Sequence, residues 1–141
     1  MNEIQVKVCA GKEAELELLA KLNKQLIEDE KHDNPMNVAQ LKDRMRAFIS
    51  TDYRAYLFEA NGETAGYALV NHSRQPLHVR QFFICRECRR NGYGRAAFEK
   101  LLEQLHTQHV DIEVMYGNEA GYAFWKSIGF VERSIYMRRG E

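Results

Sequence analysis

The chain has 141 residues, of which 45% are hydrophobic, and its 20 basic and 20 acidic side chains give a formal net charge of zero at pH 7. This length suffices for one domain with a substantial core and is short for two, so we expect a single domain over residues 1–141. No apolar stretch approaches the roughly 18 residues of a membrane helix, and the polar start is unlike a leader peptide. We therefore expect a cytoplasmic protein that binds no membrane.

The first half of the chain carries strand and helix patterns in turn. Residues 4–8 alternate apolar and polar side chains, which predicts a half-buried strand. Leucines at three- and four-residue spacing predict an amphipathic helix over residues 13–28, and Asn37 can cap a second helix that runs to Ile49. The pair Asn61-Gly62 then separates two apolar segments, which is the strongest short-range signal for a β-hairpin.

The second half predicts five further elements. A strand over residues 77–84 is followed by a helix from Gly94, a short strand over 112–114 and a helix over about 118–127. A last strand is expected from Phe130 to Met137. The complete order is βααβββαβαβ, without internal repeats or linkers.

A basic loop with two glycines, residues 89–95, lies between a strand and the start of a helix. Free N–H groups at a helix start point outward together, the helix dipole adds partial positive charge, and glycines let a ligand approach the main chain. Four arginines raise the local potential further: Arg86, Arg89, Arg90 and Arg95. Because the whole chain is neutral, this local patch indicates an anionic ligand, and its form indicates a diphosphate.

A dinucleotide-binding Rossmann unit is the first alternative, because Gly92-x-Gly94-x-x-Ala97 also fits its fingerprint. In that fold the glycine loop follows its strand almost at once, and an acidic residue ends the next strand. Here seven residues separate Ile84 from Gly92, and Asp111 would begin the next strand. The spacing therefore disfavours the Rossmann interpretation.

Two motifs carry a resemblance to a known family. Arg89-x-x-Gly92-x-Gly94 resembles the signature (Gln or Arg)-x-x-Gly-x-(Gly or Ala) of the GNAT superfamily of N-acetyltransferases, where it holds the pyrophosphate of acetyl-CoA. Asn118-x-x-Gly121-x-x-x-Trp125-x-x-x-Gly129-Phe130 is similar to the family's segment Asn-x-x-Ala-x-x-x-Tyr-x-x-x-Gly-Phe. The resemblance covers roughly residues 54 to 137 and departs from the family at Gly121, which replaces Ala, and at Trp125, which replaces Tyr.

The resemblance implies an α/β (α+β) GNAT fold, with a mixed, mostly antiparallel sheet of six to seven strands and about four helices on both faces. It also implies acetyl-CoA as co-substrate. In such proteins the strand before the loop and the next strand splay apart around pantetheine, and the loop wraps the diphosphate. Carried over to this sequence, the binding residues are Phe82, Phe83, Ile84, Arg89, Arg90, Asn91, Gly92, Tyr93, Gly94, Arg95, Asn118 and Trp125.

The catalytic groups are less well marked than the binding loop. Trp125 aligns with a tyrosine that often protonates the leaving thiolate, but indole has no acidic proton near neutrality. Tyr122, one turn after Asn118, is the substitute candidate, with protonation by solvent as the alternative. For the general base we name Glu28, from the acidic segment at the junction of the first two helices, and His32 as a second choice.

The expected activity is N-acetyl transfer from acetyl-CoA to a primary amine of a small molecule or peptide, directly within a ternary complex. The alternative is a non-catalytic acyl-CoA-binding module. Nucleic-acid binding is disfavoured by the balanced charge. Cys85-x-x-Cys88 lacks the second ligand pair of a structural zinc site, so no metal is expected. Similar proteins often pair through their last strands, so we include a homodimer among the expectations.

Overall fold

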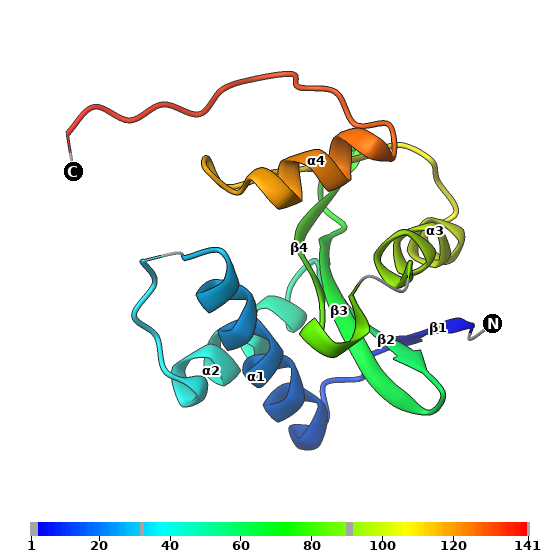
Figure 1. The fold of residues 1–141 in the computed structure, drawn as a ribbon. Helices are drawn as coiled ribbons and strands as arrows, with labels where there is room; N and C mark the ends of the chain where they lie inside the picture. The colour runs from blue at the N-terminus through cyan, green and yellow to red at the C-terminus, as the bar shows by residue number, and fades with distance from the viewer. Residues whose placement is uncertain (1–2, 32, 90–91, 141) are drawn as a thin grey trace.

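The computed structural model describes residues 3–31, 33–89 and 92–140 (Figure 1). The site predictions for His32, Arg90 and Asn91 lie outside the described residues. The elements in chain order are β1 (Ile4–Val8), α1 (Glu13–Asp29), α2 (Val38–Ile49), β2 (Tyr53–Ala60), β3 (Glu63–Asn71), β4 (Leu77–Ile84), a short 3₁₀ turn (Arg86–Cys88), α3 (Tyr93–Leu105), β5 (Val110–Ile112) and α4 (Glu119–Ser127).

The five strands form one sheet in the order β1-β2-β3-β4-β5. All neighbouring pairs are antiparallel except β4 and β5, which run parallel. The predicted hairpin is confirmed, since Asn61 and Gly62 join β2 to β3 with φ angles of 55° and 77°. Glycine and asparagine are the residues that adopt this left-handed conformation most readily.

Helices cover both faces of the sheet, as the sequence predicts (Figure 1). On one face, leucines of α1 and Met45 of α2 pack against Tyr67 and Phe83. On the other face, Phe98 and Leu101 of α3 pack with Phe58, and Trp125 of α4 joins this cluster. The spacing of these apolar residues every three or four positions explains why each helix buries one side only. The two layers fix the position of the β4–α3 junction between them.

The predicted strand count is too high, and the predicted last strand is wrong. The sheet has five strands in the described chain, and residues 131–140, here called the C-terminal tail, form neither strand nor helix. Two anchors at the start of the tail direct it along α4: the Phe130 N–H donates to the Trp125 carbonyl at 3.1 Å, and Glu132 pairs with Lys126 at 2.8 Å. β5 has the expected length of three residues and begins two residues earlier than expected, at Val110.

None of the helices among the described residues combines the length and apolar character that a bilayer crossing requires.

Candidate functional site

β4 and β5 pair only over their first three residues. Leu77–Val79 of β4 is in register with Val110–Ile112, whereas β4 continues to Ile84. Residues 81–84 therefore have ladder partners on the β3 side but none on the β5 side within the described chain. Main-chain groups on an open strand edge are free to bind another extended chain.

The alternation of the peptide groups shows which residues face this opening. The Cys85 N–H donates to the Ala65 carbonyl of β3 at 2.7 Å. The Phe83 carbonyl oxygen points at Gly66 of β3, only 2.0 Å from where a Cβ at that position would lie. Because neighbouring residues of an antiparallel strand point their N–H and C=O groups to opposite sides, the main-chain groups of Phe82 and Ile84 face the β5 side. This edge is the one predicted to run beside pantetheine.

The segment after β4 leads to a helix start that has no side-chain cap. Gly92 is the N-cap of α3, with φ 75° and ψ 8°, and among the described residues no side-chain cap bonds to this helix start. The first helical bond runs from the Ala96 N–H to the Gly92 carbonyl at 3.1 Å. The amides of Gly94 and Arg95 precede that bond, so they have no partner inside the helix. Their direction and the helix dipole favour an anion.

The two glycines are required for different reasons. Gly92 has a left-handed backbone, which strains any residue with a side chain, yet a Cβ there would meet nothing within 4 Å. Gly94 has an ordinary backbone, but its Cβ would lie 3.2 Å from Phe124 of α4 and 3.9 Å from Ile84. The first glycine allows the left-handed turn that begins α3, and the second lets α3 pack closely against α4.

Asp29 at the end of α1 binds two arginines of the predicted anion patch. Its carboxylate accepts hydrogen bonds from Arg86, at 3.0 and 2.5 Å, and from Arg89. Partial burial opposes ionisation of Asp29, but these hydrogen bonds outweigh it and hold the pKa of the carboxyl below its ordinary value. Arg95 pairs instead with Glu99 at 3.2 Å on the exposed surface. The positive charge of the patch is therefore partly neutralised.

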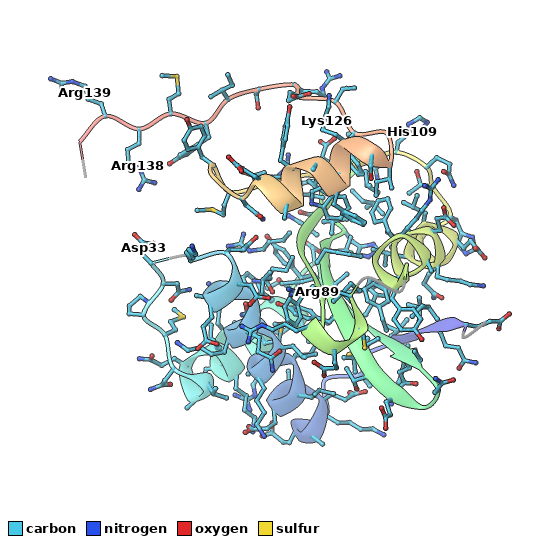
Figure 2. All side chains as sticks on the ribbon, in the orientation of Figure 1. Asp33, Arg89, His109, Lys126, Arg138 and Arg139 are labelled. Carbon is cyan, nitrogen blue, oxygen red and sulfur yellow. The ribbon has the colours of Figure 1, made fainter. Side chains whose placement is uncertain are left out.

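Arg89 (Figure 2) is held by two further contacts at the edge of the opening. Its Nε donates to the Ile84 carbonyl at 2.8 Å, and its guanidinium lies 5.2 Å from the centre of the Phe83 ring. Together with Asp29, these contacts link the end of α1, the end of β4 and the loop before α3. Sequence reasoning missed Asp29, although the acidic residues around it and the basic loop were both visible.

α4 begins with a side-chain cap, unlike α3. The Asn118 Oδ1 accepts a hydrogen bond from the Gly121 N–H at 3.0 Å. A Cβ at Gly121 would lie 2.4 Å from the Asn118 Nδ2, so the replacement of the family's usual alanine by glycine gives this amide its space. Because the Asn118 Oδ1 atom accepts the capping hydrogen bond, the predicted contact with pantetheine would use the Asn118 Nδ2 atom.

Trp125 lies in an aromatic cluster rather than on an open surface. Its ring centre is 4.9 to 5.3 Å from the ring centres of four phenylalanines, which are Phe82, Phe98, Phe124 and Phe130. The cluster joins β4, α3 and α4, so the side chain of Phe82 is part of the core while its main chain faces the opening. Trp125 thus fixes α4 beside the edge of β4.

The two predicted catalytic residues are both accessible to solvent. The Tyr122 hydroxyl donates to the Glu132 carboxylate, and this hydrogen bond raises the pKa of the phenol above its ordinary value. Glu28 lies exposed on the last turn of α1, next to Asp29. Glu28 lies near the loop before α3, because its neighbour Asp29 accepts hydrogen bonds from Arg86. Tyr122 lies on α4, within a different element. The catalytic roles of both residues stay predictions.

Two polar groups under the α1–α2 layer were missed by the sequence interpretation. The hydroxyl of Tyr67, which is completely buried, donates to the Gln81 Oε1 at 2.7 Å. Asn23 of α1 is 1% exposed, and neither polar atom of its amide has a hydrogen-bond partner among the described residues. Tyr67 lies in an apolar stretch, and Asn23 lies one turn from Leu19 and next to Leu22 on the apolar side of its helix, which are the signals that could have identified them.

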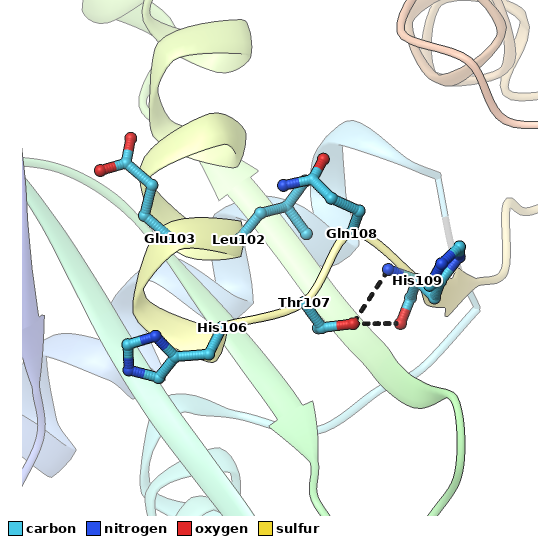
Figure 3. Close-up of a pocket in the computed structure, with 6 residues that line it drawn as sticks. All are labelled: Leu102, Glu103, His106, Thr107, Gln108 and His109. Carbon is cyan, nitrogen blue, oxygen red and sulfur yellow. Dashed lines mark hydrogen bonds between the residues drawn. The ribbon is translucent and has the colours of Figure 1, made fainter.

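A shallow depression at the opposite end of α3 is a poor candidate for the anion (Figure 3). It has a volume of about 570 Å³ and is lined by Leu102, Glu103, His106, Thr107, Gln108 and His109. The helix dipole is negative at this end, and Glu103 adds a formal negative charge. The N-terminal end of α3 is therefore the favoured anion site.

Comparisons with solved structures show proteins of the same fold. A possible acetyltransferase from Clostridium difficile 630 superposes with a TM-score of 0.75 at 14% identity, over 99% of this chain and 97% of the other. A predicted acetyltransferase from Clostridium acetobutylicum, solved with acetyl-CoA, has a TM-score of 0.70 at 11% identity, over 97% and 96% of the two chains. Aminoglycoside N-acetyltransferase AAC(6')-Iy, in complex with CoA, has a TM-score of 0.71 at 16% identity, over 99% and 96%.

The sequence matches no curated protein. The family model of the acetyltransferase (GNAT) domain matches residues 17–138, which is most of the chain and includes both predicted motifs. Together with the fold shared with the solved acetyltransferases, this match confirms the resemblance seen in the sequence. The chain belongs to the GNAT family of acetyltransferases.

Proposed function

We propose that this protein is a cytoplasmic N-acetyltransferase that moves the acetyl group of acetyl-CoA to a primary amine of a small molecule or peptide, with residues 1–141 as one catalytic domain. The observation that carries the proposal is the start of α3, where Gly92 leaves the first amides of the helix without a side-chain cap. The complexes of similar structures with acetyl-CoA and CoA support the choice of ligand.

In this proposal the diphosphate of acetyl-CoA binds at the amides of Gly94 and Arg95, with the rest of the loop, residues 89–93, around it. Hydrogen bonds from main-chain amides to a charged phosphate are charge-assisted and roughly twice as strong as bonds between neutral groups. Arg89 gives the patch a fixed guanidinium because Asp29 and Ile84 hold it in place.

Pantetheine then follows the open edge of β4. The N–H groups of Phe82 and Ile84 face that edge, and one of them polarises the thioester carbonyl and stabilises the oxyanion that forms on attack. Phe83 contributes through its ring, which packs under the Arg89 guanidinium. Asn118 reaches the same arm through its Nδ2 atom, and Trp125 holds α4 in position.

The chemistry is direct transfer within a ternary complex. The neutral amine forms a bond to the carbonyl carbon, the C–S bond breaks, the proton of the amine leaves to Glu28 or water, and the thiolate takes a proton from Tyr122 or water. An acyl-cysteine intermediate is disfavoured at Cys85, because burial raises the pKa of its thiol to about 11 and the reactive thiolate is scarce at neutral pH.

The alternative is an acyl-CoA-binding module without turnover. Two observations favour it: Trp125 lacks an acidic proton, and the phenol of Tyr122 already donates to Glu132. The two functions differ in product formation, and both require binding of the coenzyme.

The test is incubation with acetyl-CoA and a panel of amines, namely an aminoglycoside, a polyamine and a peptide with a free N-terminus. Acetylated amine should be detected by mass spectrometry, since a colour reaction for free thiol would also report the protein's own partly exposed Cys88. We expect acetylation of at least one class at a rate above that of the uncatalysed reaction. Calorimetric binding of acetyl-CoA without product from any amine would instead establish the binding module.

A further inference from the structure

Two arginines on the α1–α2 face of the sheet share one aromatic ring. The guanidinium carbon of Arg44, on α2, lies 5.5 Å from the centre of the Phe48 ring, and that of Arg80, on β4, lies 4.9 Å from it. Arg80 also lies 6.0 Å from the ring centre of Tyr53. An aromatic ring attracts a cation through its negative face, but it carries no net charge. The ring therefore brings two positive charges together without neutralising them.

No acid pairs with these two arginines within the described chain. The ion pairs described on α2 use Lys42 and Arg46, which bind exposed acids of α1 and α2, and none uses Arg44. The Arg44 Nε atom is buried and has no hydrogen-bond partner among the described residues. Burial lowers the pKa of Arg44, and the charge of Arg80 lowers it further. A partly buried pair of like charges is unfavourable unless an anion joins it.

A β-bulge in β4 places Arg80 on this face. Two consecutive residues of β3 pair with Val79 and Gln81, so Arg80 between them is the extra residue of the bulge. Arg80 reaches the aromatic ring on α2, and the next residue, Gln81, accepts a hydrogen bond from Tyr67 of the cluster under α1. Two successive side chains of β4 therefore point to the same face, which regular strand alternation does not allow. Bulges that redirect a side chain in this way are frequent next to active sites.

The bulge lies where β4 and β5 separate. The pairing with β5 ends at Val79, so Arg80 is the first residue of β4 beyond it. Phe82, one of the two residues whose N–H is proposed to polarise the thioester carbonyl, follows two residues later, roughly 7 Å along the strand. The two arginines therefore lie beside the opening in which the acceptor amine attacks.

The polar groups next to this pair offer donors and no free acceptor. The Gln81 Oε1 accepts from the Tyr67 hydroxyl at 2.7 Å, and no described residue accepts a hydrogen bond from the Gln81 amide nitrogen. The guanidinium groups of Arg44 and Arg80 are donors only. Guanidinium groups match the planar or tetrahedral oxygens of a carboxylate or phosphate, and the charge makes these hydrogen bonds strong. The arrangement is therefore complementary to an oxyanion.

We propose that the acceptor amine carries a carboxylate or phosphate group, which binds at Arg44 and Arg80 while its amino group faces the open edge of β4. This inference rests on the proposed acetyl transfer and narrows its acceptor to anionic amines. An amino acid or an aminoalkyl phosphate has the required pair of groups. A polyamine lacks the anion, and its own positive charges would be repelled by the two arginines.

The first test compares amines that differ only in the anionic group. Amino acids of increasing length, from glycine upward, are each paired with their amides, and 2-aminoethyl phosphate is paired with ethanolamine. The ratio of kcat/KM within each pair is measured by mass spectrometry of the product, with rates referred to the unprotonated amine. We expect the wild type to prefer the anionic member of one series by at least about a hundredfold, because each arginine contributes a hydrogen bond to a charged group. The series with the preference distinguishes carboxylate from phosphate.

Arg44→Gln and Arg80→Gln should each lower this preference at least about tenfold. The matched control is Arg54→Gln, which removes the same charge from β2 beside Tyr56, on the α3 face of the sheet, and should keep the preference. Because the ratio compares two substrates on one preparation, a partly unfolded variant does not alter it.

A second test separates binding from turnover, so that this inference and acetyl transfer fail in different ways. The Nε–H signals of Arg44 and Arg80 are followed by ¹H–¹⁵N NMR, with and without CoA, while each amine is added. We expect the anionic amines to move both signals, and their neutral counterparts to move neither. These shifts without acetylation of any amine would remove acetyl transfer and keep the anion site. Acetylation without preference for the anionic member, or arginine signals that no anionic amine moves, would overturn the anionic acceptor.

Discussion

The starts of α3 and α4 differ in how their first amides are satisfied, although both helices lie on the same face of the sheet. At α4 the side chain of Asn118 accepts the hydrogen bond of the Gly121 amide at 3.0 Å. At α3 the corresponding position is Gly92, and it has no side chain to offer. The first amides of α4 thus have a hydrogen-bond acceptor within the helix, whereas those of α3 are available to a ligand.

α2 resembles α4 in this respect, because Asn37 accepts from the Gln40 N–H at 2.9 Å. α1 begins after Lys12, whose side chain makes no capping hydrogen bond, and the Lys12 N–H itself donates to Glu15 at 3.1 Å. Glycine at an N-cap costs only a few tenths of a kcal/mol of helix stability relative to a capping side chain. The start of α3 thus combines free amides with a glycine backbone and neighbouring arginines, which is typical of an anion-binding site.

Gly92→Val should have the largest effect. The positive φ of Gly92 would strain a valine by roughly 1–3 kcal/mol, and relief of this strain would change the helix start that presents the amides of Gly94 and Arg95. Loss of about two charge-assisted hydrogen bonds corresponds to an increase of about a hundredfold in the dissociation constant for CoA, measured by calorimetry.

Gly62→Val is the matched control, because Gly62 also has a positive φ of 77° and open space around its Cβ position but lies in the β2–β3 hairpin. It should lower the thermal midpoint by a similar amount and leave the affinity for CoA within about twofold. An equal loss of affinity in both variants would mean that the comparison between helix starts reflects stability alone.

Arg89→Ala should rank second, and Arg95→Ala well below it. Arg89 is fixed by Asp29, Ile84 and Phe83, whereas Arg95 belongs to an exposed pair with Glu99. We expect the dissociation constant for CoA to rise about tenfold for Arg89→Ala and about twofold for Arg95→Ala, because exposed ion pairs contribute little. The reverse ranking would show that the arginine bound by Asp29 serves the fold and not the ligand.

Asn118 allows the cap of α4 to be separated from its proposed contact with the ligand. Asn118→Ala should lower the free energy of unfolding by about 1 kcal/mol, measured in urea. Asn118→Asp keeps an oxygen for the cap but has no amide N–H, so it should restore stability while the KM for acetyl-CoA stays raised by a few fold. A KM of Asn118→Asp equal to the wild-type value would show that Asn118 caps α4 and does not contact the ligand.

The smallest effect concerns the pH dependence of the segment after α4. Hydrogen bonds from Lys126 and then Tyr122 lower the pKa of Glu132 from 4.5 to about 2. Because the folded-state pKa is depressed, the stabilising contribution is present above about 4.5 and is lost as pH falls toward 2. An NMR titration of the Glu132 carboxyl should show the low pKa, and Lys126→Met should raise it. A midpoint near 4.5 in the unaltered protein would disprove the anchor.

Local signals predicted much of the fold and the binding loop. Asn61-Gly62 identified the hairpin, and the spacing of Gly92 and Gly94 identified the start of α3, because turn and helix-start chemistry depends on adjacent residues. The family match supports the same interpretation. The cap at Asn118 was likewise readable from residue type and position.

Long-range features could not be predicted in the same way. The contact of Asp29 with Arg89 joins residues 60 positions apart, and nothing local distinguishes Asp29 from its acidic neighbours. The contact between Gly94 and Phe124 depends on how two helices pack. The last strand was predicted wrongly for a related reason: the apolar residues at both ends of segment 130–137 are compatible with a strand, but strand formation also requires a pairing edge from a distant part of the chain.

The most direct test of the account follows the backbone amides of α3 by ¹H–¹⁵N NMR while CoA is added. We predict that the largest downfield proton shifts occur at Gly94 and Arg95, that pantetheine without its diphosphate leaves these two signals nearly unchanged, and that the amides at His106 and His109 do not respond. Saturation with CoA that leaves Gly94 and Arg95 unmoved, or moves chiefly the signals at the C-terminal end of α3, would contradict the account.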